Sequence, residues 1–160
     1  MMSQPFETVI EEQLRLHGSY AACAVGNSMR PMLRDRSDVV VLVTPFREPC
    51  KYDVILYRGS DGRYILHRII KLRKDEYLVR GDNTYFTERV AKSDVIALLA
   101  SYNKNGKDRS LTSPSYKLYS RIWNCIYPVR KLCHGMKAFA SRVFRKLFTR
   151  KKTERHNHDE

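Results

Sequence analysis

Apolar and polar residues alternate with two different periods along this chain, and the first period is helical. Near the N-terminus Ser3 is a suitable helix cap, Pro5 stands in the first turn, and Gly18 is typical of a helix end. Between them apolar residues recur every three or four positions, at Phe6, Val9, Ile10 and Leu14. Residues 1–19 are therefore expected to contain an N-terminal helix.

Short apolar runs separated by turn-forming residues follow from residue 20 to about residue 103. They are rich in Val, Ile, Leu and Tyr and predict strands at Tyr20–Val25, Asp38–Val43, Asp53–Arg58, Tyr64–Leu72, Glu76–Arg80 and Val95–Tyr102. RGSDGRY predicts a hairpin with a type I′-like Asp61-Gly62 pair, and KLRKDEYL predicts a second hairpin. The expected fold is mainly β, a small antiparallel β-barrel or sandwich over residues 20–103.

The remaining chain changes character. Residues 104–113 are polar and predict a linker, and Ser113-Pro114 is a typical helix start. Two apolar stripes with a basic rim then predict an amphipathic helical segment over 114–150, interrupted at Pro128, and 151–160 are expected to be disordered. The first stripe is Leu118, Tyr119, Ile122, Trp123 and Ile126, and the second runs from Val129 to Leu147.

Charge separates the two parts of the chain. The formal net charge is +13, and about +11 of it lies in residues 101–160, where 15 Lys and Arg face 4 Asp and Glu. An anionic partner would therefore be attracted by the C-terminal part. No nucleic-acid-binding motif accompanies this charge, so nucleic acid is an unfavoured partner.

Neither a secretory signal nor a membrane span is expected. The N-terminus carries acids where a signal peptide would be apolar, and the longest aliphatic run is Val39–Val43. We therefore expect a protein on the cytoplasmic side, peripheral to the membrane. The four cysteines have no CxxC spacing, which predicts reduced thiols and neither a metal site nor a cofactor.

Three residues suggest acyl-transfer chemistry. Ser28 follows a strand-like run in AVGNSMRPML, and a serine becomes a nucleophile when a base removes its proton. His67 stands within the apolar strand YILHRII and titrates where a general base should. Asp82, in VRGDN, could accept the other imidazole N–H. Each residue alone also has an ordinary structural explanation.

Together and in this order, GNSMRPML, YDVILYR, YILHRII and VRGDN resemble the type I signal peptidases and their relatives, the self-cleaving SOS-type repressors. The resemblance covers about residues 20–100. It implies Ser28 as nucleophile, His67 in place of the lysine base of most bacterial signal peptidases, and Asp82 as the acidic residue. It also implies a signal-peptidase-like β-fold and a substrate face formed by Met29, Pro31 and Met32.

The implied reaction is cleavage of signal-type or leader-type peptides or precursor proteins through a Ser28 acyl-enzyme. The Ser28 backbone N–H would bind the oxyanion. Many bacterial relatives have a hydroxyl residue two positions before the nucleophile, where this chain has Gly26, so the second oxyanion donor stays open. The repressor alternative is disfavoured because only about 27 residues precede Ser28, without a helix-turn-helix or an Ala-Gly or Cys-Gly pair.

A second class of function stays open. The basic amphipathic segment fits a helix lying on an anionic membrane surface, and its expected contacts are Trp123, Arg130, Lys131, Phe139, Arg145 and Lys146. Alternatively, the apolar stripe packs on the β-domain and the charges are merely solvated. The chain is thus either a serine endopeptidase or a catalytically silent membrane-surface binding module.

Overall fold

The computed structural model describes residues 5–136, with side chains from Val9 onward. The chain divides into two compact units after Trp123, and the first holds the β-domain. Its elements are α1 (Pro5–His17), β1 (Ser19–Cys23), β2 (Val39–Val43), β3 (Val54–Arg58), β4 (Tyr64–Leu72), β5 (Glu76–Arg80), β6 (Glu88–Ala91), the short 3-10 helix η1 (Lys92–Asp94), β7 (Val95–Lys104), β8 (Lys107–Ser110) and the start of α2 (Pro114–Cys125). Residues 127–136 are again helical.

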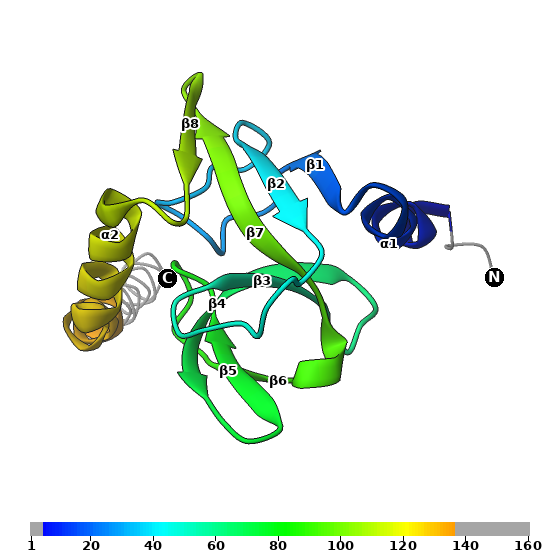
Figure 1. Ribbon diagram of the computed structural model, residues 1–160. Helices are drawn as coiled ribbons and strands as arrows, with labels where there is room; N and C mark the ends of the chain where they lie inside the picture. Colours follow the sequence, from blue (N-terminus) through cyan, green and yellow to red (C-terminus); the bar gives the residue numbers. More distant parts are fainter. Residues whose placement is uncertain (1–4, 137–160) are drawn as a thin grey trace, which may run out of the picture. The chain divides into compact units, whose positions relative to one another are not determined.

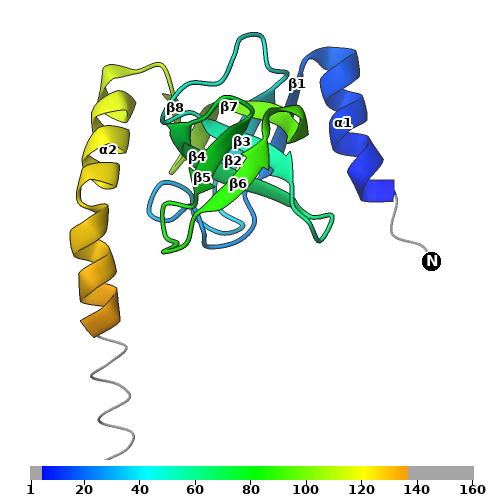
Figure 2. The same cartoon turned by 90° about the horizontal axis from the view of Figure 1, so that it is seen from below.

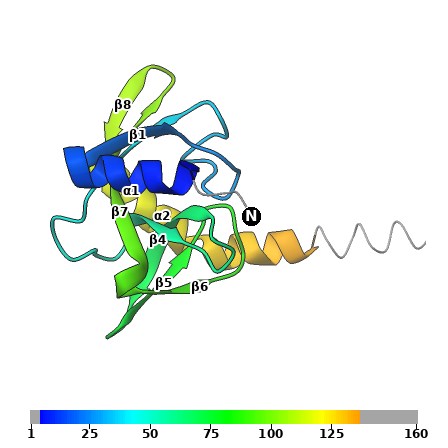
Figure 3. The same ribbon diagram turned by 90° about the vertical axis from the view of Figure 1, so that its right-hand side faces the viewer.

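The strands form one antiparallel sheet, which confirms the expected mainly β fold. Its order is β1-β2-β7-β3-β4-β5-β6, and β8 pairs with β7 (Figure 1). β3 lies between β4 and β7, and four of its five residues are buried, which explains its continuous apolar sequence. α1 packs beside β1 (Figure 3), and α1 and the start of α2 lie at opposite sides of the sheet (Figure 2).

Two apolar clusters fill the β-domain, and β4 contributes to both. Ile65 packs against the cluster that contains Ile55 and Tyr57, whereas Leu66 packs against the cluster that contains Met29 and Leu33. His67 pairs with Ile55 in the register and so shares the first of these faces. Successive side chains of YILHRII therefore alternate between the two clusters.

The sequence-based boundaries differ from the structure at two turns. Residues 104–113 are not a simple linker, because Asn105 and Gly106, at φ 56° and 73°, turn the chain from β7 into β8. Positive φ at both positions is the requirement of a type I′ hairpin. The Asp61-Gly62 hairpin exists between β3 and β4, but of these two residues Gly62 alone has positive φ, so its turn is not type I′.

Candidate active site

Ser28 lies in the loop that joins β1 to β2. The base of this loop is closed by hydrogen bonds from the Ala24 N–H to the Asp38 carbonyl (2.9 Å) and from the Arg36 N–H to the Ala24 carbonyl (2.7 Å). The buried Asp38 carboxylate accepts from the backbone and side chain of Arg34. Beyond Ser28 the chain turns sharply, and the Leu33 N–H donates to the Met29 carbonyl (2.9 Å). The Ser28 side chain is left half-buried at the surface of the domain.

The loop after β5 holds the Ser28 segment from the other side. The Asn83 N–H donates to the Ser28 carbonyl oxygen at 2.7 Å, and the Asn83 side-chain amide donates to the Asn27 carbonyl at 3.3 Å. Thr84 closes this second loop by donating its N–H and its hydroxyl to the Gly81 carbonyl (3.1 Å each). The sequence GDN therefore fixes the backbone of the candidate nucleophile.

Gly81 brings Ser28 and His67 together. The register of β4 and β5 pairs Arg68 with Arg80, so Gly81, the first residue after β5, faces His67. A Cβ atom on Gly81 would lie 2.9 Å from His67 Nε2, 3.0 Å from Ser28 Cβ and 2.7 Å from the Ser28 carbonyl oxygen. The imidazole and the serine side chain thus approach the same point, which a glycine leaves open. No hydrogen bond joins the two side chains within the described residues. Such contacts often tighten only when substrate binds.

Two residues of other strands occupy the opposite edge of the imidazole. The Tyr57 hydroxyl lies 3.1 Å from His67 Nδ1 and donates to Glu88 Oε2 at 2.6 Å. Glu88 Oε1 lies 3.5 Å from the same Nδ1 atom. His67 is 3% exposed, and this burial lowers its pKa, while the negative charges of Glu88 and Asp82 act in the opposite direction. The burial of Tyr57, together with its hydrogen bond to Glu88 and the charge of Glu88, raises the pKa of the Tyr57 hydroxyl far above its ordinary value.

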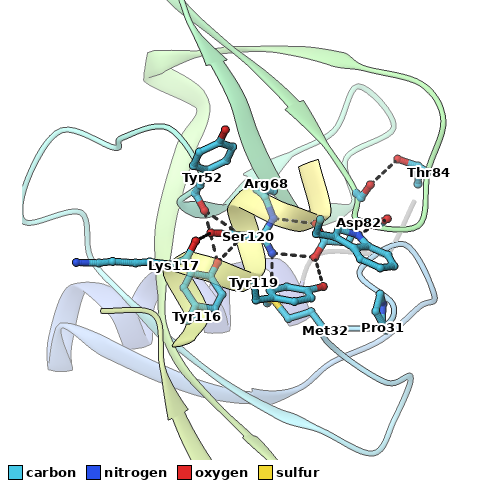
Figure 4. Close-up of polar contacts among 12 residues, drawn as sticks. Pro31, Met32, Tyr52, Arg68, Asp82, Thr84, Tyr116, Lys117, Tyr119 and Ser120 are labelled. Atoms are coloured by element: carbon cyan, nitrogen blue, oxygen red, sulfur yellow. Dashed lines mark hydrogen bonds and ion pairs between the residues drawn. The ribbon is translucent and has the colours of Figure 1, made fainter. Parts of the chain in front are cut away.

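The expected contact between Asp82 and His67 is replaced by another. Asp82 makes a bidentate ion pair with Arg68, in which the Nε and Nη2 atoms of Arg68 each lie 2.8 Å from one carboxylate oxygen of Asp82. Asp82 also accepts a hydrogen bond from the Tyr119 hydroxyl (3.1 Å). Arg68 is fully buried and also donates to the Tyr116 hydroxyl and the Tyr52 carbonyl (Figure 4). A buried guanidinium requires a paired carboxylate, and Asp82 supplies it.

The expected substrate face is corrected in part. Met29 and Met32 are buried in the core, and Met32 Sδ accepts a hydrogen bond from Arg68, whereas Pro31 is exposed. A thioether packs well against irregular neighbours, so core packing explains both methionines. Pro31 and Met32 also border a pocket of about 570 Å³ between the Ser28 loop, the β7–β8 hairpin and the start of α2.

The expected membrane contacts fall into three groups. Trp123 is half-buried, stacks on Tyr119 with ring centroids 5.9 Å apart, and donates its indole N–H to the Asp82 carbonyl (3.0 Å). It is therefore a packing residue of the β-domain. Arg130 and Lys131 belong to the helical residues 127–136, with Arg130 half-buried and Lys131 exposed. Phe139, Arg145 and Lys146 lie outside the described residues.

Neither a metal centre nor a membrane span is found in the described part of the chain. Residues 5–136 contain no group of three or more potential ligands among His, Cys, Asp and Glu. The four cysteines are free and exposed. None of the described helices has an apolar stretch long enough to cross a bilayer.

Sequence reasoning overlooked Tyr57, Arg68 and Glu88. The signal for Tyr57 was the β3–β4 hairpin itself, because its register places Tyr57 opposite Ile65, two residues from His67 on the same face. Arg68 was noticeable as a charge inside an apolar strand. Glu88 had no comparable signal, because β6 is only four residues long and was not expected.

No protein-family model matches this chain, and no curated protein is significantly similar to it.

Proposed function

We propose that this protein is a serine endopeptidase with Ser28 as nucleophile and His67 as general base. The observation that carries the proposal is the approach of Ser28 Cβ and His67 Nε2 to one point beside Gly81. The imidazole is buried with a lowered pKa, so it is neutral near pH 7, as a base must be. The resemblance to signal peptidases assigns the same roles to the same two residues.

The reaction follows from these positions. His67 Nε2 accepts the Ser28 hydroxyl proton while Ser28 Oγ attacks the scissile carbonyl carbon, and the backbone N–H of Ser28 stabilises the resulting oxyanion. The imidazolium then gives its proton to the departing amine as the carbon–nitrogen bond breaks. Water, deprotonated by the same imidazole, hydrolyses the ester and restores Ser28.

The substrate class rests on the resemblance. We infer signal-type or leader-type peptides or precursor proteins, cleaved in an extended segment that passes Ser28. Pro31 is the exposed member of the expected substrate face, and it borders the pocket next to the Ser28 loop.

A fluorophosphonate probe tests the proposal without knowledge of the substrate, because it modifies serine residues that a base has activated. Mass spectrometry is expected to find the adduct on Ser28 and to find none in His67→Ala. Ser37→Ala and His17→Ala are matched controls, because both residues are exposed and lie away from the imidazole. Labelling of Ser28 that persists in His67→Ala, or no labelling of the folded wild type, would contradict the proposal. Comparison of protein N-termini in cells that express wild type or Ser28→Ala would then identify substrates.

The silent membrane-binding module is the second candidate, and the helical residues 127–136 favour it by themselves. Val129, Leu132 and Met136 are exposed at helical spacing, with Lys131 exposed beside them. We infer that this helix lies on an anionic membrane surface. The full chain should co-sediment with vesicles that contain phosphatidylserine but not with phosphatidylcholine vesicles, and Leu132→Glu should abolish binding. Equal binding by Leu132→Glu would contradict this inference.

A further inference from the structure

Three side chains from three strands form a continuous hydrogen-bonded chain behind the candidate base. His67 comes from β4, Tyr57 from β3 and Glu88 from β6. The Tyr57 hydroxyl contacts both neighbours, at 3.1 Å from His67 Nδ1 and 2.6 Å from Glu88 Oε2. Tyr57 and His67 are buried and Glu88 is half-buried, so water cannot easily replace the contacts of the Tyr57 hydroxyl with His67 and Glu88.

The direction of the first hydrogen bond follows from counting protons. Carboxylate oxygens accept hydrogen bonds, so Tyr57 must donate its single hydroxyl proton to Glu88. The Tyr57 oxygen then has only acceptor capacity toward His67, and Nδ1 must carry the proton of the neutral imidazole. A neutral imidazole has one N–H, so Nε2 keeps a free electron pair.

Nε2 is also the nitrogen that faces Ser28. It lies 2.9 Å from the point beside Gly81 that is 3.0 Å from Ser28 Cβ. The electron pair is therefore on the side where a base for Ser28 needs it. The opposite tautomer would direct an N–H toward Ser28 and could not remove the hydroxyl proton.

We propose that Tyr57 and Glu88 form a relay that holds His67 in its Nδ1–H tautomer. They are positioning residues, and their catalytic consequence rests on the proposed function. In that reaction one proton moves from Ser28 Oγ to Nε2 and on to the leaving amine, while the Nδ1 proton stays in place. Glu88 stabilises the transient imidazolium across the Tyr57 hydroxyl, which is the part expected for Asp82 from the sequence.

The surroundings of His67 are consistent with this division of roles. The charged groups that act on its titration are Glu88 and Asp82, and Asp82 is held by Arg68. Glu88 borders a pocket of about 690 Å³ at the surface, so it can be changed with little disturbance of the core. A substitution at Glu88 therefore tests the relay more cleanly than one at the buried Tyr57.

Nitrogen-15 NMR of histidine-labelled full-length protein reads the tautomer directly, because protonated and unprotonated ring nitrogens have very different shifts. His67→Gln identifies the His67 signals among the five histidines. At neutral pH the wild type is expected to show protonated Nδ1 and unprotonated Nε2. Glu88→Leu leaves the Tyr57 proton free to be donated to Nδ1, so a large part of the population should shift to Nε2–H. Glu88→Gln, a closer match in shape, should relax the preference in the same direction.

Glu76→Gln is the matched control, because Glu76 is also a strand glutamate but pairs with Arg73. It should leave the His67 signals unchanged. If wild-type His67 is Nε2–H, or if both Glu88 variants keep the Nδ1–H spectrum, the relay is overturned. In the Glu88 variants, fluorophosphonate labelling of Ser28 should slow by about 10- to 100-fold. A tautomer shift in a protein whose Ser28 is never labelled would support the relay and contradict only the peptidase proposal.

Discussion

The Asn83 amide donates a 2.7 Å hydrogen bond to the carbonyl oxygen of Ser28. This bond joins two loops that are more than fifty residues apart in the sequence, and it holds the candidate nucleophile against the end of β5. Gly81 belongs to the same loop as Asn83 and faces His67. The loop Gly81–Asn83 therefore positions both Ser28 and His67. Its backbone holds Ser28 by a hydrogen bond, and the missing side chain of Gly81 leaves room for the imidazole of His67.

Gly81→Ala should strongly slow the proposed reaction. The new methyl group would lie under 3.0 Å from the Ser28 carbonyl oxygen and His67 Nε2, so backbone and imidazole must separate. Displacements of this size reduce reaction rates by about 100-fold. The rate of fluorophosphonate labelling measures the loss. Gly135→Ala is the control, since a Cβ there meets no atom within 4 Å, and it should label at the wild-type rate.

Asp82→Ala should lower the stability of the fold but leave the tautomer of His67 unchanged. It leaves the fully buried Arg68 without its carboxylate, which costs about 3–5 kcal/mol of unfolding free energy. Urea denaturation measures this change. Asp61→Ala is the control, because its ion pair with Arg63 is exposed and its loss should hardly change the unfolding free energy. In the folded fraction of Asp82→Ala, His67 should keep its Nδ1–H tautomer. A change of the His67 tautomer in Asp82→Ala would show that Asp82, and not Glu88, orients the imidazole.

The pH dependence of labelling should reveal the buried imidazole. Burial lowers the pKa of His67 below its ordinary value of 6.5, so the base stays neutral and labelling stays constant down to that pH. Labelling is then lost at lower pH as His67 takes up a proton. Because the charge of Glu88 raises this pKa, Glu88→Leu should move the midpoint to a still lower pH. A midpoint above 6.5 in the wild type, or an upward move in the variant, would contradict this assignment.

The same shift predicts a change of stability with pH. The unfolded chain binds the His67 proton more tightly than the folded chain, so the unfolding free energy should fall as the pH is lowered through 6.5. Urea denaturation at pH 7.5 and pH 5.5 measures the fall. In His67→Gln this contribution is absent, and the fall should be smaller than in the wild type.

Trp123→Phe should loosen the start of α2 from the loop GDN. It removes the indole hydrogen bond to the Asp82 carbonyl, which costs about 1 kcal/mol. Thermal unfolding followed by circular dichroism measures the loss. Ile122→Ala on the same helix is the control, because Ile122 is 51% exposed and its truncation should change stability by less than about 0.5 kcal/mol. Equal losses in the two variants would show that the indole hydrogen bond contributes nothing.

Much of the sheet could be predicted because its signals are local. β4 and β5 begin and end where alternation and turn residues indicated, at Tyr64–Leu72 and Glu76–Arg80. The β7–β8 hairpin was equally local, in the pair Asn105-Gly106, but the polar composition of the segment concealed it. β6 and its Glu88 were beyond such reasoning, because a four-residue strand is defined by its partner rather than by its own pattern.

Residue types and local patterns identify the residues that are chemically able to act: a serine in a turn, a histidine within an apolar strand, and several carboxylates. Which of them come into contact depends on the packing of the strands. Pairing of β3 with β4, and of β6 with β5, brings Tyr57 and Glu88 to Nδ1 of His67, while the buried guanidinium of Arg68 pairs with Asp82. Asp82 follows a strand-like run in the sequence, whereas Glu88 begins the short strand β6. Their roles differ because strand alternation places His67 and Arg68 on opposite faces of β4, and each face has its own acidic partner.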